Sequence, residues 1–207
     1  MPTAEDLRAL SGNELNLLGA AAAERGAAFC RVLGSDEQQE WLSRGLHLMW
    51  AAVSGEATAD DCLEHLDALE AADAENQDEE HDPTAHPGFY ADQAIGLVAE
   101  ALAGSANPSP ERVERALRTL RTLCSMVDFK LGGEVPVIVR SSDPRPAPGP
   151  LARMELDAEN ELVARLAGAR ETSSNTASAD EIRATAEEFG REVTSAVKGF
   201  AAASNWE

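Results

Sequence analysis

Residues 11–33 read SGNELNLLGAAAAERGAAFCRVL, which has the pattern of a long helix. Ser11 followed by Glu14 matches the S-x-x-E capping box, a common start of a helix. Small and apolar residues then recur at steps of three and four, which places them on one helix face. They are Leu15, Leu18, Ala22, Gly26, Phe29 and Leu33. Gly19 and Gly26 each cost a helix about 1 kcal/mol relative to alanine, so we expect close contacts with other helices at these positions.

The same helical periodicity recurs along most of the chain. Apolar stripes with three- and four-residue steps lie within residues 41–53, 62–69, 89–102, 113–127, 151–166 and 182–200. Aromatic residues make up only 4% of the chain, which disfavours strands because strand formers are mostly aromatic or β-branched. The sequence therefore predicts an all-α protein, a single antiparallel bundle of six to eight helices. The predicted core residues are Phe29, Trp41, Trp50, Leu66, Leu120 and Leu162.

Three segments are expected along the chain. Residues 1–170 are predicted to form the helical bundle, residues 171–178 a polar linker, and residues 179–207 an amphipathic helix and tail. That helix carries Phe189 and Phe200 on its apolar stripe, which must be buried on its own bundle or on a partner. We therefore expect a homo-oligomer through this helix as one alternative. The proline-rich stretch 135–150 is predicted to be an irregular loop, and its role stays open.

The charge of the chain is unusual and unevenly distributed. The formal net charge is −20, and residues 45–111 hold fifteen Asp or Glu and no Lys or Arg. Such a charge repels phosphate, so we expect neither nucleic acid nor a membrane as a partner. Cys30, Cys62 and Cys124 are odd in number and widely spaced, which is atypical of a disulfide framework. With no apolar run that is long enough to span a bilayer, these features predict a cytoplasmic protein.

One acidic surface is the candidate functional site. Its residues belong to a helix and to the loop that follows: Asp60, Asp61, Glu64, Asp67, Glu70, Asp78, Glu79, Glu80 and Asp82. A continuous negative field of this kind accelerates association with a basic protein. The sequence thus predicts a non-enzymatic acidic protein-binding module, for example an immunity or inhibitor protein for a basic toxin or nuclease. The plain alternative is a solvated connector between two helices.

Other chemistry is weakly indicated. Cys62 and His65, with His81 and His86, have spacings seen in metal sites, but a structural zinc site usually begins with a close cysteine pair. We therefore predict neither a metal nor a cofactor. The second functional alternative is a small metal- or ligand-dependent enzyme or ligand-binding protein, and it requires a polar pocket.

Two further groups of charged residues are candidates for a functional site. Glu155, Asp157, Glu159 and Glu161 could offer paired carboxylates, but Glu155 and Glu159 lie one turn apart beside an apolar stripe, which is typical of a solvated edge. We therefore predict no catalytic residues. The second group is a row of arginines at steps of three: Arg112, Arg115, Arg118 and Arg121. These arginines are expected to pair with acidic side chains of neighbouring helices.

Three stretches resemble a known family when taken in order. They are FCRVLGSDEQQEWLSRGLHLMWAAVSGE at 29–56, LEHLDALEAADAENQDEEHDPTAHPGFYADQAIGLVAEALAG at 63–104 and PLARMELDAENELVARLAG at 150–168. In helix lengths, in the position of Trp50 and in the acidic inter-helix loop, they resemble the YjaG-like family of small all-helical bacterial proteins of unknown function. The resemblance implies an all-α bundle and brings no activity with it. The proline-rich segment 143–150 and the tail after residue 170 depart from the pattern.

Overall fold

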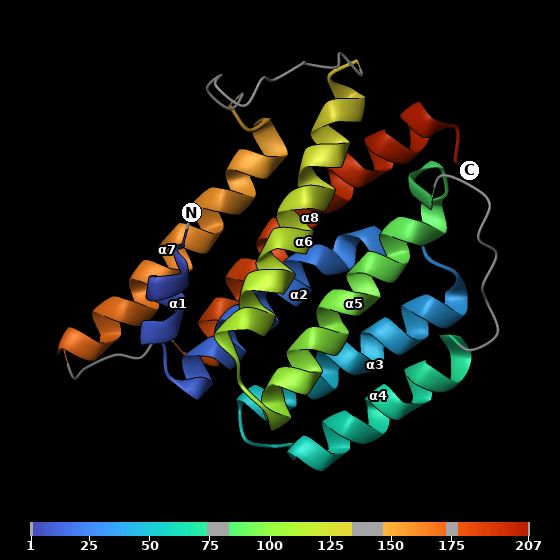
Figure 1. Ribbon diagram of the computed structural model, residues 1–207. Helices are drawn as coiled ribbons and strands as arrows, with labels where there is room; N and C mark the ends of the chain where they lie inside the picture. Colours follow the sequence, from blue (N-terminus) through green and yellow to red (C-terminus); the bar gives the residue numbers. More distant parts are fainter. Residues whose placement is uncertain (1, 74–82, 134–146, 173–177, 207) are drawn as a thin grey trace.

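The computed structural model describes residues 2–73, 83–133, 147–172 and 178–206, which form a bundle of α-helices (Figure 1). The elements are α1 (Ala4–Ala9), α2 (Gly12–Leu33), α3 (Asp36–Val53), α4 (Ala59–Asp73), the 3₁₀ turn η1 (Pro83–Ala85), α5 (Pro87–Ala106), α6 (Pro110–Leu131), α7 (Pro150–Thr172) and α8 (Ala179–Ser204). No strand occurs in these ranges, so the all-α prediction is confirmed. Most of the proline-rich stretch, residues 134–146, and linker residues 173–177 lie outside them.

The helix α2 is the centre of the bundle. It packs against α3, α5, α6, α7 and α8, and Figure 1 shows it with α3 and α4 on one side and α7 on the other. Every residue from Leu18 to Cys30 is buried. A helix that is covered on all sides needs small or apolar residues around its whole circumference, and the alanines of this stretch provide them. The sequence pattern predicted one buried face for this helix, whereas the structure buries its whole circumference between Leu18 and Cys30.

Close helix contact at Gly26 is confirmed, whereas Gly19 has more room. A Cβ atom on Gly26 would lie 2.3 Å from Leu97 Cδ1 and 3.4 Å from Leu120 Cδ1. The nearest atom to a Cβ on Gly19 is Val113 Cγ2, at 3.9 Å, an ordinary van der Waals distance. The same substitution at these two positions of one helix therefore compares a tightly packed site with a roomier one.

We expect Gly26→Ala to lower the free energy of unfolding by about 1–3 kcal/mol, because the added methyl overpacks a well-filled core. Gly19→Ala should leave stability unchanged or raise it by up to about 1 kcal/mol, since alanine is the better helix former. Urea denaturation of both variants checks the prediction. Equal effects of the two substitutions would show that the close approach at Gly26 does not limit packing.

Helix starts follow local sequence in most places, but α7 depends on a neighbouring helix. The Ser11 backbone N–H donates to Glu14 at 2.6 Å, which confirms the predicted capping box. At α7 the backbone N–H groups of Leu151 and Ala152 instead donate to the two carboxylate oxygens of Asp128, at 3.0 and 2.9 Å. Because Asp128 belongs to α6, this cap fixes where α7 begins relative to α6.

The apolar stripe of α8 is buried on its own bundle, chiefly against α2. Its buried members are Ile182, Ala186, Gly190, Val193, Val197, Phe200 and Ala201. This is the first of the two alternatives that the sequence left open, and an oligomer through α8 would have to use its outer face. The core prediction is confirmed for Phe29, Trp50, Leu120 and Leu162, which are buried, whereas Trp41 and Leu66 are only partly buried and pack against the core.

Candidate functional site

The helix α4 presents acidic side chains to solvent. Asp60, Glu64 and Asp67 are exposed and follow one another at steps of four and three, so they share one face. Leu63 lies between them in sequence and is 42% exposed, one of the few large apolar side chains left in water. None of the three carboxylates forms an ion pair with a residue in the described ranges. We call Asp60, Leu63, Glu64 and Asp67 the outer face of α4.

Asp61, another predicted site residue, has a structural role. Its carboxylate accepts hydrogen bonds from the Thr58 backbone N–H and hydroxyl, both at 2.7 Å, and the Asp61 N–H donates back to that hydroxyl at 3.2 Å. These hydrogen bonds from Thr58 lower the pKa of Asp61. The structure thus uses this exposed carboxylate to cap the start of α4.

The remaining members of the predicted acidic surface are not placed. Asp78, Glu79, Glu80 and Asp82 lie outside the described residues, and so does the side chain of Glu70 within α4. One cation borders the placed part. Burial lowers the pKa of His65 in α4, the contact with the Trp41 backbone oxygen partly opposes this, and the charge of Arg44 of α3 adds to the lowering. Arg44 is itself paired with Glu40, so its charge is partly compensated.

The metal candidates of α4 are engaged in packing. Cys62 is fully buried, and burial raises the pKa of its thiol. The His65 ring stacks on Trp41 with 4.6 Å between ring centroids, and its Nε2 lies 3.2 Å from the Trp41 backbone oxygen. His86 precedes α5, whereas His81 lies outside the described ranges. No cluster of three potential ligands occurs in the part of the chain that was described.

A buried ion pair crosses the core between α2 and α7. Arg25 donates from Nε and Nη2 to the two oxygens of Glu155, at 2.8 and 2.6 Å, and both side chains are buried. The Phe189 ring of α8 lies 5.6 Å from the guanidinium carbon. Burial alone lowers the pKa of Arg25, but the charge and hydrogen bonds of Glu155 outweigh it and raise the pKa. The pair is bidentate, the geometry in which guanidinium and carboxylate attract most strongly.

A second buried carboxylate lies one turn further along α7. Glu159 is fully buried; its Oε1 lies 3.3 Å from Arg121 Nε, and neither oxygen accepts a hydrogen bond from the described residues. Burial, with the charge of Glu155 adding to it, raises the pKa of Glu159 to about 8. The prediction that Glu155 and Glu159 form a solvated edge was therefore wrong. We call Arg25, Glu155, Glu159 and Arg121 the buried ionic cluster.

Another buried carboxylate of α2 is fully hydrogen-bonded. Glu24 accepts from Arg31 Nη2 at 2.8 Å and from Trp50 Nε1 at 3.0 Å, which ties α2 to α3. The sequence reading did not single out Glu24 or Arg25. The sequence feature that could have indicated them is a pair of adjacent charged residues within a run of alanine and glycine. Charged residues are rarely buried unless they are paired, and both of these are paired.

The buried ionic cluster has little room for a ligand. The cavity beside it, between Arg25, Leu162 and Phe189, holds about 50 Å³, well below the roughly 300 Å³ at which small-molecule sites begin. The cavity of about 720 Å³ along α6 is within the usual range. Arg121 belongs to both the buried ionic cluster and the lining of this cavity, but neither Glu155 nor Glu159 lines it.

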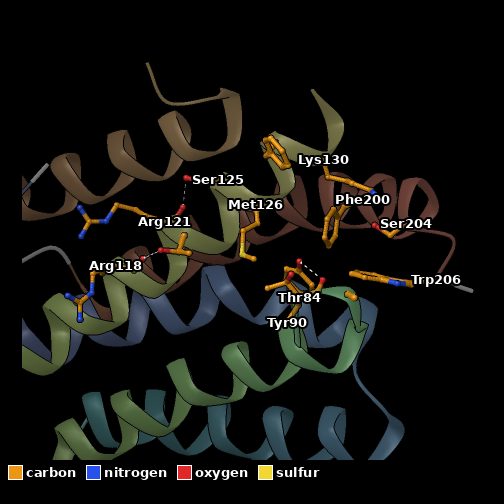
Figure 2. Close-up of a pocket in the computed structure, with 13 residues that line it drawn as sticks. Thr84, Tyr90, Arg118, Arg121, Ser125, Met126, Lys130, Phe200, Ser204 and Trp206 are labelled. Atoms are coloured by element: carbon orange, nitrogen blue, oxygen red, sulfur yellow. Dashed lines mark hydrogen bonds between the residues drawn. The ribbon is translucent and has the colours of Figure 1, made fainter. Parts of the chain in front are cut away.

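The large cavity lies between α6, α8, η1 and the start of α5, and we call it the α6 cavity (Figure 2). Its described lining residues are Thr84, Ala85, Tyr90, Arg118, Arg121, Thr122, Ser125, Met126, Phe129, Lys130, Phe200, Ser204 and Trp206. Figure 2 shows Arg118 and Arg121 at one end and Tyr90, Phe200 and Trp206 at the other. This site was not predicted from the sequence.

The arginine row of α6 behaves mostly as expected. Arg112 and Arg115 both pair with Glu100 of α5, and Arg121 lies beside Glu159 of α7. The side chain of Arg118 is exposed and makes neither an ion pair nor a hydrogen bond with any described residue. Pairing with neighbouring helices therefore accounts for three of the four arginines.

Comparisons with protein-family models, with curated proteins and with solved structures found no match to this chain. The resemblance to the YjaG-like family therefore stays a prediction. None of the described helices combines the length and the apolarity needed to cross a membrane.

Proposed function

We propose that the protein is a non-enzymatic binding module whose outer face of α4 docks on a basic protein, in the manner of an immunity or inhibitor protein. The carrying observation is the exposure of Asp60, Glu64 and Asp67 on one face, with no ion-pair partner among the described residues. Elsewhere in the bundle many carboxylates are paired or cap helices. Unpaired carboxylates in water are available to a partner's lysines and arginines.

Leu63 adds an apolar contact to this charged face. Interfaces commonly surround a small apolar centre with polar residues, and the charges accelerate encounter and fix the orientation. A leucine that is 42% exposed between carboxylates fits this arrangement. The inner side of α4 packs on α3 and α5, so the outer face is held on a folded support. Docking on the outer face therefore requires no opening of the bundle.

The enzyme alternative finds less support in the geometry. Its reaction would need titratable groups that converge on a cavity. The perturbed carboxylate Glu159 lies in the buried ionic cluster, whereas the α6 cavity has no Asp or Glu among its described lining residues. The three cysteines are free and buried, which suits the cytoplasmic location that we include in this proposal.

The test removes three charges from α4 and compares a matched control. The docking variant is Asp60→Asn, Glu64→Gln, Asp67→Asn. The control is Asp157→Asn, Glu188→Gln, Glu192→Gln, which removes three exposed carboxylates from α7 and α8 and gives the same net charge. Partners are captured from the native host at low salt, identified by mass spectrometry and purified, and their Kd values are then measured by calorimetry.

We expect a basic partner whose Kd rises at least tenfold with the docking variant and less than twofold with the control. The loss should shrink at high salt, because salt screens exposed charges beyond about 10 Å at 0.1 M. Equal affinities of the two variants, or the absence of any captured basic protein at low salt, would overturn the proposal.

A further inference from the structure

The α6 cavity gathers positive charge in a strongly acidic chain. Arg118, Arg121 and Lys130 line it, and its described lining contains no Asp or Glu, although the whole chain carries −20. Of the three cations, Arg118 is the one whose side chain has no partner in the described ranges, since Arg121 lies beside Glu159 and Lys130 makes further contacts. A cation in this position attracts an anion into the cavity.

The cation and the apolar surface lie at opposite ends of an elongated space. Arg118 and Phe129 are eleven positions apart on α6, which corresponds to about 16 Å along the helix axis. Figure 2 shows Met126 between Arg118 and Phe200. A second cavity of about 170 Å³ shares Arg118, Thr122 and Met126 with the first and extends it toward Phe89. A ligand that uses both ends must be long and amphiphilic.

The apolar end is preformed. Tyr90, Phe200 and Trp206 form an aromatic cluster with ring centroids 5.0–5.4 Å apart, and the Tyr90 hydroxyl donates to the Thr84 backbone oxygen at 3.1 Å. Trp206 is held by the end of α8. Asn205 adopts the left-handed conformation, and the Trp206 N–H donates to the Ala201 oxygen at 3.0 Å. A surface fixed in this way binds a ligand with little ordering cost.

The polar groups between the two ends do not compete for an acid group. The hydroxyls of Thr122 and Ser125 donate to backbone oxygens of their own helix, at 2.9 and 2.8 Å. Their protons are therefore used, and recognition of an anion falls to the guanidinium of Arg118. An arginine binds a carboxylate through two parallel N–H donors.

We propose that the α6 cavity binds an elongated organic anion with an apolar tail, of the chemical class of fatty acids. The acid group lies at Arg118, and the tail lies over Met126, Phe129 and the aromatic cluster. This site is separate from the outer face of α4, so it stands or falls independently of the docking proposal.

The test uses dodecanoate and its uncharged counterpart 1-dodecanol, each measured by displacement of 1-anilinonaphthalene-8-sulfonate from the protein. Arg118→Gln should weaken dodecanoate binding about tenfold or more and change dodecanol binding less than twofold. The matched control Arg191→Gln removes an exposed arginine of α8 that does not line the cavity. It should change the binding of neither ligand. Phe129→Glu should weaken both ligands, because it replaces apolar lining by a negative charge.

Phe129 is 49% exposed and Arg118 is exposed, so both variants are expected to fold, which circular dichroism verifies. The proposal is overturned if dodecanoate at up to 1 mM displaces no 1-anilinonaphthalene-8-sulfonate from the wild-type protein. It is also overturned if Arg118→Gln and Arg191→Gln act alike, or if Phe129→Glu binds both ligands as tightly as wild type does.

Discussion

Replacing Arg25 by methionine is expected to lower the free energy of unfolding by about 3–5 kcal/mol at pH 7. The substitution leaves the Glu155 carboxylate buried without its bidentate partner, and an unpaired buried charge is among the most destabilising changes known for a core. Chemical denaturation followed by circular dichroism measures the loss. A protein of this size has only about 5–15 kcal/mol of stability, so the variant should be near the limit of folding at 37 °C.

Two comparisons separate this effect from lost packing. The double variant Arg25→Met, Glu155→Met removes both charges, and it should recover most of the loss because apolar replacements of buried ion pairs are often tolerated. Arg44→Met breaks the exposed pair with Glu40 and should cost less than about 1 kcal/mol. Equal costs for Arg25→Met and Arg44→Met, or a double variant as unstable as the single one, would show that Arg25 does not stabilise the fold by compensating the buried charge of Glu155.

The second large effect is the pH dependence that Glu159 produces. Its pKa is raised from 4.5 to about 8 by burial and by Glu155. The folded state therefore holds a proton that the unfolded state releases above pH 4.5. Stability from this group is complete below pH 4.5, falls as the pH rises, and is fully lost above about pH 8. We expect a loss of up to about 1.4 kcal/mol per pH unit within that window.

Glu159→Gln should remove this dependence, because the amide has the same shape and carries no charge at any pH. Its free energy of unfolding should be close to wild type at pH 5 and about 1–3 kcal/mol higher than wild type at pH 9. The matched control is Glu161→Gln, an exposed neighbour on α7, which should follow the wild-type profile. The groups that face Glu159, namely Glu155, Arg121, Arg25 and Cys124, are common to all three proteins. Parallel profiles of wild type and Glu159→Gln would contradict the assignment.

Most helices of the bundle could be predicted from local sequence. Capping boxes at Ser11 and Thr58, and the proline at the start of α6, are short-range signals that depend on a few neighbouring residues. Apolar periodicity then identified the buried sides of α3, α6 and α8. The structure agrees with these signals because each depends on residues within one helix and not on distant parts of the chain.

The buried side of α7 was misplaced for a physical reason. Its core-facing positions follow strict three- and four-residue steps through Ala152, Glu155, Glu159, Leu162 and Leu166. Two of the five are glutamates, and a pattern based on hydrophobicity assigns glutamate to solvent. The arginine that compensates the charge of Glu155 lies 130 positions away on α2. The local sequence around Glu155 therefore gives no sign that this glutamate is paired and buried.

The α6 cavity could not be predicted from the sequence for a related reason. It combines residues of η1, α5, α6 and α8, and its aromatic end depends on the left-handed turn at Asn205 that places Trp206 beside Phe200. In the sequence these residues are far apart, and Tyr90 and Phe200 look like ordinary core positions. The acidic outer face of α4, by contrast, was predictable because exposure and charge are both local properties of one helix.

Docking by the outer face of α4 is tested most directly by the rate at which the captured basic partner associates with the protein at several ionic strengths. Stopped-flow measurements compare wild type with the α4 docking variant and with the α7/α8 control of equal net charge. We predict that wild type and control associate 10-fold or more faster than the docking variant at low salt, and that the three rates converge as salt increases. Equal rates for the docking variant and the control at every salt concentration would contradict a docking role for this face.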